Sequence, residues 1–300
     1  MDAIISIATI YIFIVIGFVA KKSFKDKIDE KTLILLSLYF LQPILTFWGL
    51  TQTKLSVELL LTPVYYLLAV FITLGISILI SKKILSNSKE RSIFIAASLI
   101  GNTGNLGIPL GIALFGEASV AYTSIINIAN IFFIYTVGIY FYAKEQFDLK
   151  GSLKQIAKIP ILWVAIIALW YNYMQFPINT QIQKFLLMGA YATIVIQLII
   201  FGIYLANIQL KQIDYRFSSK IISIKHILLP TVGFGVVWYF NIDSFIATIL
   251  LLELMVPLAV NNVNLSALYN CKPYKTTEAV FVTTIFFILF IYFYLQILGV

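Results

Sequence analysis

Long apolar runs, separated by short polar connections, follow one another along the chain and decide what it can fold into. An α-helix needs about 20 apolar residues to cross a bilayer, and ten runs approach or exceed that length. They cover residues 3–20, 31–50, 57–80, 92–115, 119–143, 157–174, 183–207, 220–239, 244–269 and 276–298. Hydrophobic residues make up 61% of the chain and charged residues only 11%, against about half and a quarter in soluble domains. We therefore expect an all-α integral membrane protein with ten transmembrane helices.

Basic residues alternate between the connections in a way that supports this count. All but two of the 21 basic residues fall in the odd-numbered connections. They are Lys21, Lys22, Lys25, Lys27, Lys31, Lys82, Lys83, Lys89, Arg91, Lys144, Lys150, Lys154, Lys158, Lys211, Arg216, Lys220, Lys225, Lys272 and Lys275. Because cytoplasmic loops are enriched in Lys and Arg, we expect both termini on the non-cytoplasmic side of the plasma (inner) membrane. Such dispersed clusters argue against a nucleic-acid partner, which would require one basic face.

The fourth run is interrupted by residues that a membrane helix tolerates poorly. Residues 101–109 read Gly-Asn-Thr-Gly-Asn-Leu-Gly-Ile-Pro. Irregular backbone survives at membrane depth only where protein buries it or where it lines a wet cavity. We therefore expect a helix break here, beside a polar binding site.

Ten helices with both termini on one side can divide into two inverted sets of five, at residues 1–148 and 149–300. Inverted repeats are common in secondary transporters, which bind substrate between broken helices near the midplane. This division predicts a second break in the ninth run. Residues 253–264 read Glu-Leu-Met-Val-Pro-Leu-Ala-Val-Asn-Asn-Val-Asn, with a proline and three asparagines at the expected place.

These two motifs resemble those of the auxin efflux carrier family, and with the helix count the resemblance covers nearly the whole chain. The run from Gly101 to Pro109 is similar to the family's fourth-helix signature, and the run from Met255 to Asn261, continuing to Tyr269, to its ninth-helix motif. The resemblance implies an inverted-repeat fold like that of bile acid/sodium symporters, with helices 1, 2, 6 and 7 as scaffold. It implies a moving transport unit of helices 3–5 and 8–10, in which broken helices 4 and 9 cross. It also implies transport of an organic anion such as auxin, malate or malonate, and a homodimer formed through the scaffold.

The residue types at the two breaks suit an anion. A helix broken at Pro109 would present a new N-terminus, with proline in its first turn, and such ends favour negative groups. Asparagine amides can donate to a carboxylate. The expected substrate-binding residues are Asn102, Asn105, Gly107, Pro109, Pro257, Asn261 and Asn262. Since no lysine or arginine is expected near the middle of a span, we expect dipoles and amides, not ion pairs, to hold a mono- or dicarboxylate.

Three further polar residues fall inside predicted spans. Asn127 and Asn130 share a helix face and either join the substrate site or bond to a neighbouring helix. Glu253 is an acidic residue well inside a span, where ionisable groups often mark ion paths. It either couples transport to H⁺, or forms a hydrogen bond within the bundle, or lies closer to the outer interface. The expected coupling ion is H⁺ or Na⁺. His226 is expected near the cytoplasmic interface, with no role.

Other function classes fit the sequence less well. One histidine and one cysteine give neither a metal-ligand cluster nor a nucleophile with its base, so we expect no enzyme activity, no metal and no cofactor. A membrane sensor would need an output domain, whereas every connection here is short. An anion channel or facilitator using the same crossing remains open, since sequence does not reveal alternating access.

Overall fold

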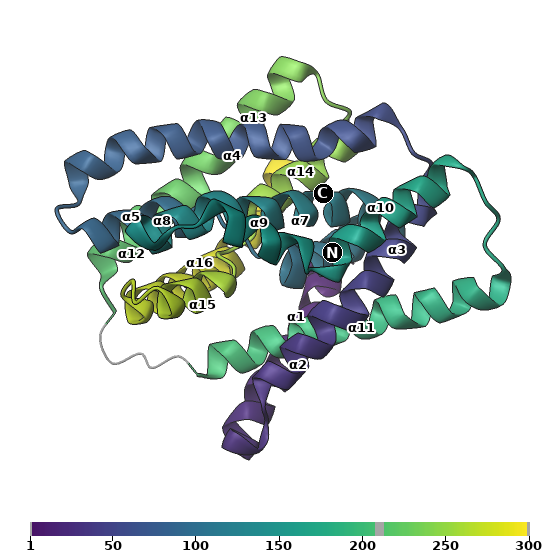
Figure 1. The fold of residues 1–300 in the computed structure, drawn as a ribbon, viewed down its shortest axis with the longest axis horizontal. Helices are drawn as coiled ribbons and strands as arrows, with labels where there is room; N and C mark the ends of the chain where they lie inside the picture. The colour runs from purple at the N-terminus through teal and green to yellow at the C-terminus, as the bar shows by residue number, and fades with distance from the viewer. Residues whose placement is uncertain (1, 208–212, 299–300) are drawn as a thin grey trace. The chain divides into compact units, whose positions relative to one another are not determined.

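The described part of the chain, residues 2–207 and 213–298, is helical along nearly its whole length in the computed structural model (Figure 1). Within these residues, the extended pairing is limited to one isolated bridge between Gly101 and Leu258. A helix satisfies its own backbone groups, which lipid does not do. The structure thus agrees with the all-α membrane class predicted from the sequence.

Seven helices in the described residues are long and apolar enough to cross a membrane. They cover Ile7–Lys27, Glu30–Gln52, Val57–Ile84, Glu117–Ala143, Thr180–Ala206, Tyr215–Phe240 and Pro273–Gln296. An eighth span results if α9 (Leu149–Ala157) and α10 (Pro160–Tyr173), which meet at 58°, are counted together. The other predicted spans, 92–115 and 244–269, are interrupted, and their apolar helices are short. The count of ten and the inverted repeat therefore stay predictions.

The chain forms two compact units, each assembled from both halves of the sequence. Unit 1 comprises Met1–Leu61, Gly104–Ile128 and Gln155–Asn207. Unit 2 comprises Thr62–Thr103, Ala129–Lys154 and Ile208–Val300. The division at residue 148 concerns repeats of sequence and not compactness, so the units do not test it.

Four helices make up most of unit 1. These are α1 (Asp2–Phe24), α3 (Gln42–Gln52), α10 and α11 (Thr180–Ala206), with the short α2 (Glu30–Leu36) and α6 (Ile108–Phe115). Asn172 of α10 ties down the end of α3, because its amide nitrogen donates to the carbonyls of Leu50 (2.5 Å) and Thr53 (2.6 Å). Thr193 of α11 donates to the carbonyl of Leu41 at 2.9 Å. Thr193 thus joins α11 to the start of α3.

Two glycines bring α1 and α11 into backbone contact (Figure 1). A Cβ atom at Gly17 would overlap the carbonyl oxygen of Ile199, and one at Gly202 would overlap that of Ile14. Small residues let membrane helices approach this closely, where van der Waals packing replaces the missing hydrophobic drive. No other residue type fits at these two positions without moving a helix.

Unit 2 holds both interrupted segments. Its helices are α4 (Val57–Ile84), α5 (Ser88–Ala97), the end of α7 (Val120–Phe133), α8 (Ile139–Ala143), α12 (Tyr215–Ile222), α13 (Leu229–Phe240), α14 (Ser244–Met255), α15 (Asn261–Leu268) and α16 (Pro273–Leu298). A π-helical turn, Ser223–Leu228, joins α12 to α13 without a break. Such turns occur often at functional sites.

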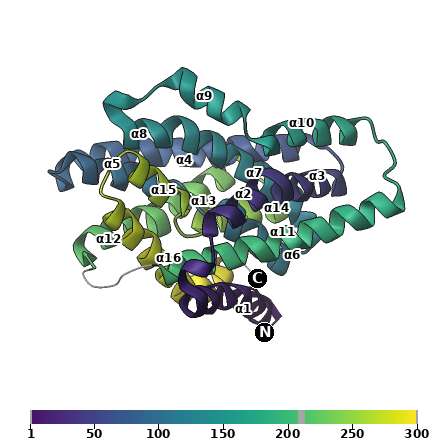
Figure 2. The same ribbon diagram turned by 60° about the horizontal axis from the view of Figure 1, so that its bottom comes forward.

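Ion pairs hold one end of unit 2 together, where α5, α12 and α15 gather in both views (Figures 1 and 2). Glu90 of α5 lies 2.6 Å from Lys272 Nζ and 2.7 Å from Lys275 Nζ. Lys275 also lies 2.8 Å from Asp214, just before α12. The hydrogen bonds from the two lysines hold the pKa of Glu90 below its usual range. These residues come from three of the basic connections predicted to be cytoplasmic.

Candidate functional site

The two interrupted segments pair with each other through their backbones. The amide of Asn102 donates to the carbonyl of Pro257 at 2.8 Å, and the amide of Ala259 donates to the carbonyl of Ile100 at 2.9 Å. Proline has no N–H, so Pro257 can join such a ladder only through its carbonyl. The crossing thereby pairs backbone groups that the broken helices leave without partners, as burial requires. We call residues 100–102 and 257–259 the crossing.

The half-helix after the first break begins earlier than the sequence suggested. A π-helical turn, Thr103–Gly107, runs directly into α6, and Gly107 has helical angles of φ −61° and ψ −52°. The α-helix α6 begins at Ile108 with Pro109 in its first turn, as predicted, and the π-helical turn extends the helical backbone back to Thr103. The turn widens just before Pro109, which lacks the N–H that an α-helix would use there. On the other side, α15 begins at Asn261.

Two of the expected binding asparagines are fully engaged with the protein. Asn262 donates to the carbonyls of Ile100 (3.2 Å) and Ala259 (2.9 Å) and accepts from the hydroxyl of Tyr142 (3.1 Å). An amide with three such bonds fixes one segment to the other and has little capacity left for a ligand.

Asn130 does the same from α7. It donates to the carbonyl of Gly101 at 2.8 Å and to Thr103 Oγ1 at 2.9 Å, and it accepts from the hydroxyl of Tyr66 at 3.4 Å. Of the two roles considered for this residue, the structure thus favours the contact with neighbouring elements. Asn130 and Asn262 position the crossing.

Asn102 differs from both. Its side chain is only 3% exposed, yet its amide nitrogen has no hydrogen-bond partner among the described residues. A buried donor without a partner costs free energy. This amide is the one at the crossing that is free to donate to a ligand. Asn261, by contrast, is exposed.

The remaining predicted residues lie in unit 1. Gly107 and the half-buried Asn105 lie in the π-helical turn, Pro109 follows it in α6, and Asn127 is buried in α7. A Cβ atom at Gly104 would lie 2.9 Å from Asn127 Oδ1. Glycine therefore lets the start of this segment pack directly against the asparagine. Whether these four residues bind the same ligand as Asn102 stays a prediction.

A lysine that the sequence interpretation placed at the membrane surface is buried at the crossing. Lys225 has no exposed surface, and it is the only charged residue among the largest fully buried side chains of the described part. The helix runs from Tyr215 to Phe240, so Lys225 lies about 15 Å along it at 1.5 Å per residue. Lys225 is thus close to the centre of this helix, and the expectation that no lysine lies near the middle of a span is wrong.

Lys225 faces Glu253 of α14. Glu253 is also completely buried, as predicted, and the two side chains interact electrostatically. The ammonium nitrogen of Lys225 and the carboxyl oxygens of Glu253 are more than 4.0 Å apart, too far for an ion pair. Neither group has a hydrogen-bond partner in the described residues. Two ionisable groups at this depth, close but not paired, are costly and typical of an ion or substrate path.

The surroundings of the pair are aromatic and polar. Tyr66 of α4 interacts electrostatically with Glu253 and is fully buried. His226, next to Lys225, is 4% exposed and stacks on Phe287 and Tyr294 with ring centroids 6.4 and 6.1 Å away. His226 lies near the middle of the helix Tyr215–Phe240 and not at its end, so its expected interfacial position is also wrong.

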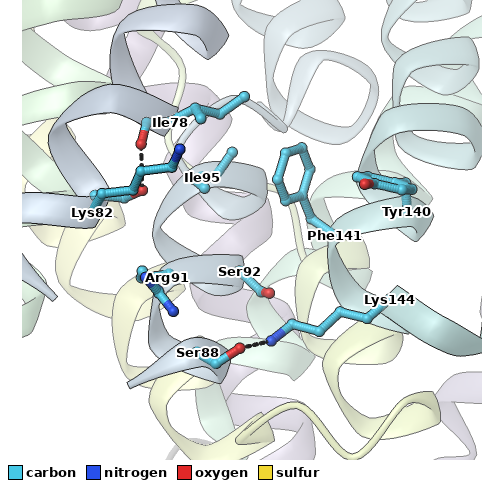
Figure 3. Close-up of a pocket in the computed structure, with 10 residues that line it drawn as sticks. Ile78, Lys82, Ser88, Arg91, Ser92, Ile95, Tyr140, Phe141 and Lys144 are labelled. Atoms are coloured by element: carbon cyan, nitrogen blue, oxygen red, sulfur yellow. Dashed lines mark hydrogen bonds between the residues drawn. The ribbon is translucent and has the colours of Figure 1, made fainter. Parts of the chain in front are cut away.

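A second, separate region of unit 2 is a basic pocket of about 570 Å³ (Figure 3). Lys82, Arg91 and Lys144 line it, and Lys144 Nζ donates to Ser88 Oγ. These cations belong to connections that the sequence assigns to the cytoplasm. The positive-inside rule already explains cations at this place, with no need of a ligand. We therefore do not count the pocket as part of the candidate site.

Comparison with known proteins agrees with this picture. Residues 2–295 match the family described as membrane transport proteins. An uncharacterized transporter from Methanocaldococcus jannaschii is 27% identical over 297 residues, covering 94% of each chain. With the helical fold and the crossing of two interrupted segments, this match leads to one conclusion. The chain belongs to the membrane transport protein family, which is the family of the auxin efflux carriers.

Proposed function

We propose that this protein is a secondary carrier that moves a small organic anion, a mono- or dicarboxylate, across the plasma membrane by alternating access. The observation that carries the proposal is the pair of buried donors at the crossing, Asn102 Nδ2 and Lys225 Nζ, neither of which has a hydrogen-bond partner in the described residues. A charge-assisted hydrogen bond to a carboxylate is about twice as strong as a neutral one. Membership of a transporter family supports the same conclusion.

The proposal includes a coupling ion. Glu253, beside Lys225, is the group that would take up H⁺ during the cycle, with Na⁺ as the alternative ion. Its complete burial and its place in the helix that ends at the crossing support this role.

The wider architecture belongs to the same proposal. It comprises ten spans in two inverted repeats, residues 1–148 and 149–300, with both termini outside and with helices 1, 2, 6 and 7 as the scaffold of a homodimer. The alternation of basic connections supports the topology. The two interruptions, five predicted helices apart, support the repeat.

A thermal-shift screen of the purified protein against acetate, pyruvate, malonate and malate tests the proposal. At least one carboxylate should raise the unfolding temperature, because a ligand that binds only the folded state stabilises it. Asn102→Ala should weaken that response by about 10- to 100-fold in apparent affinity, the worth of one hydrogen bond to a charged group. Asn264→Ala changes an exposed asparagine of α15 that is not among the expected binding residues. This matched control should respond as wild type.

Two results would contradict this assignment. If no carboxylate shifts the wild-type protein, the substrate class is wrong. If Asn102→Ala responds unchanged, the crossing is not the site. Counterflow of a responding carboxylate into liposomes then separates carrier from channel, since a carrier saturates and exchanges whereas a channel passes voltage-driven current without saturation.

A further inference from the structure

Lys225 Nζ lies against Gly101 at the crossing, and three buried polar groups of this region have no hydrogen-bond partner in the described residues. They are Lys225 Nζ, the carboxyl of Glu253 and Asn102 Nδ2. A Cβ atom at Gly101 would lie 2.9 Å from Lys225 Nζ and 3.6 Å from the Glu253 carbonyl oxygen. The absence of a side chain at Gly101 therefore lets the ammonium reach the backbone of the crossing, next to Asn102.

The number of protons on the pair decides whether an anion can enter. Lys225 and Glu253 are neutral together, whether as ammonium and carboxylate or as amine and carboxylic acid, because both forms hold the same number of protons. A monocarboxylate added to either form leaves one uncompensated negative charge in a buried place, which is costly. One proton added to the site cancels that charge, leaving Lys225 as ammonium and Glu253 as carboxylic acid.

We propose that Lys225 is the counterion of the transported anion, that Glu253 is the counterion of Lys225 in the carrier without substrate, and that each carboxylate therefore binds together with one proton. The inference rests on the proposed function and deepens it by naming the residue that contacts the anion and the stoichiometry. The proton comes from the aqueous phase to which the site is open and ends on a carboxyl oxygen of Glu253. A monocarboxylate thereby crosses without net charge movement, whereas a dianion with one proton carries one negative charge.

Other groups around the pair fit this exchange. Tyr66, from α4, faces Glu253, and its hydroxyl is already donated to Asn130 Oδ1 at 3.4 Å. His226 interacts electrostatically with Lys225 and lies among aromatic rings. Neither brings a second fixed charge, so Glu253 is the acidic partner that the structure gives Lys225.

The test measures the affinity of the full-length protein for sodium pyruvate and for sodium malonate by titration calorimetry, from about pH 5.5 to about pH 9. In wild type, affinity should fall by about tenfold per pH unit on the alkaline side, because binding takes up one proton. Glu253→Gln is a permanently uncharged stand-in for the protonated glutamate. Its affinity should stay constant over the alkaline range in which that of wild type falls.

Lys225→Met in the Glu253→Gln background tests the contact with the anion. This double variant has no buried charge at the pair, so it should fold, which gel filtration and unfolding temperature verify. It should bind both probes about 10- to 100-fold more weakly than Glu253→Gln alone.

Each outcome bears on one proposal. If Glu253→Gln keeps the wild-type slope, or if wild type shows no slope at all, the proton linkage is overturned while the carrier function stands. If the double variant binds as tightly as Glu253→Gln, Lys225 is not the counterion. If neither probe nor any other carboxylate in the thermal-shift screen affects wild type, the proposed function fails, and the inference fails with it.

Discussion

The stability of the Lys225–Glu253 pair can be measured without any substrate, by a double-mutant cycle. Lys225→Met removes the ammonium while its unbranched side chain fills similar space. Because Glu253 is completely buried and has no hydrogen-bond partner in the described residues, its carboxylate is then left uncompensated. Removing one member of a buried pair costs about 3–5 kcal/mol in the free energy of unfolding.

The double variant is needed to measure the coupling energy between Lys225 and Glu253. The charged atoms of Lys225 and Glu253 lie more than 4.0 Å apart, and the attraction at 4 Å is about 4 kcal/mol at an effective dielectric constant of about 20. We therefore expect a coupling energy below that bound, of about 1–3 kcal/mol. Replacing both groups should therefore cost less than the two single replacements added together, by that amount, since neither charge is then left buried without its counterion.

Thermal unfolding in detergent, followed by intrinsic fluorescence at pH 8, is a suitable assay. A cost of 1 kcal/mol corresponds to about 2 °C in a chain of this size, so the Lys225→Met effect is well resolved. The effect should shrink at pH 5, where the lone carboxyl can discharge itself by taking a proton. If the change in the free energy of unfolding of the double variant equals the sum of the two single changes, the claim that these groups form a pair is refuted.

Three further changes test the packing described above. Asn262→Ala removes three hydrogen bonds at the crossing and should lower the free energy of unfolding by about 1–3 kcal/mol, measured by thermal unfolding, with no loss expected in Asn261→Ala. Gly202→Val would drive a side chain into the backbone of α1, so the variant should fail to give a monodisperse gel-filtration peak, whereas Gly235→Ala, where a Cβ atom meets open space, should be tolerated. The lysine partners of Glu90 lower its pKa in the folded protein. The stability that Glu90 contributes is therefore present above its pKa in the unfolded protein, and it is lost as the pH falls through its lower pKa in the folded protein. Between about pH 5 and about pH 3, the unfolding temperature of wild type should therefore fall further than that of Glu90→Gln. An equal fall in both would show that the ion pairs of Glu90 do not stabilise the protein.

The positions of the interruptions could be predicted from the sequence, because proline and glycine act locally. The helix α14 ends at Met255, two residues before Pro257, which lacks an N–H and would clash with the preceding turn of a helix. The register of the next helix could not be predicted in the same way. Whether the turn before Pro109 is absent or widened depends on what packs around it, and the widened form places the helical end at Thr103.

The roles of the asparagines were also beyond the sequence. Asn102, Asn130 and Asn262 are chemically identical, and all three are buried. Two of them hold the crossing and one has a free amide, a difference that depends on contacts from α7, α8 and the opposite segment. The residue type predicts how many hydrogen bonds an asparagine can form, but not which groups it forms them with.

Lys225 was missed for a physical reason that the sequence does contain. Lysines near helix ends usually mark the cytoplasmic interface, and a helix starting at residue 220 would place Lys225 there. The helix instead starts at Tyr215, which carries the lysine inside. The apolar residues on both sides, Ile221 and Ile222 before it and Ile227 after it, are the signal that it lies within a span.

Main-chain atoms join the two segments of the crossing directly, and this has a consequence for how a carrier of the proposed kind can diversify. The two bonds between Asn102 and Pro257 and between Ala259 and Ile100 use amides and carbonyls, which almost every residue type provides. A substitution at position 102 can therefore change the group presented to a ligand while the scaffold of the crossing stays in place. Selectivity can drift by single mutations, and a new cargo need not cost the protein its fold.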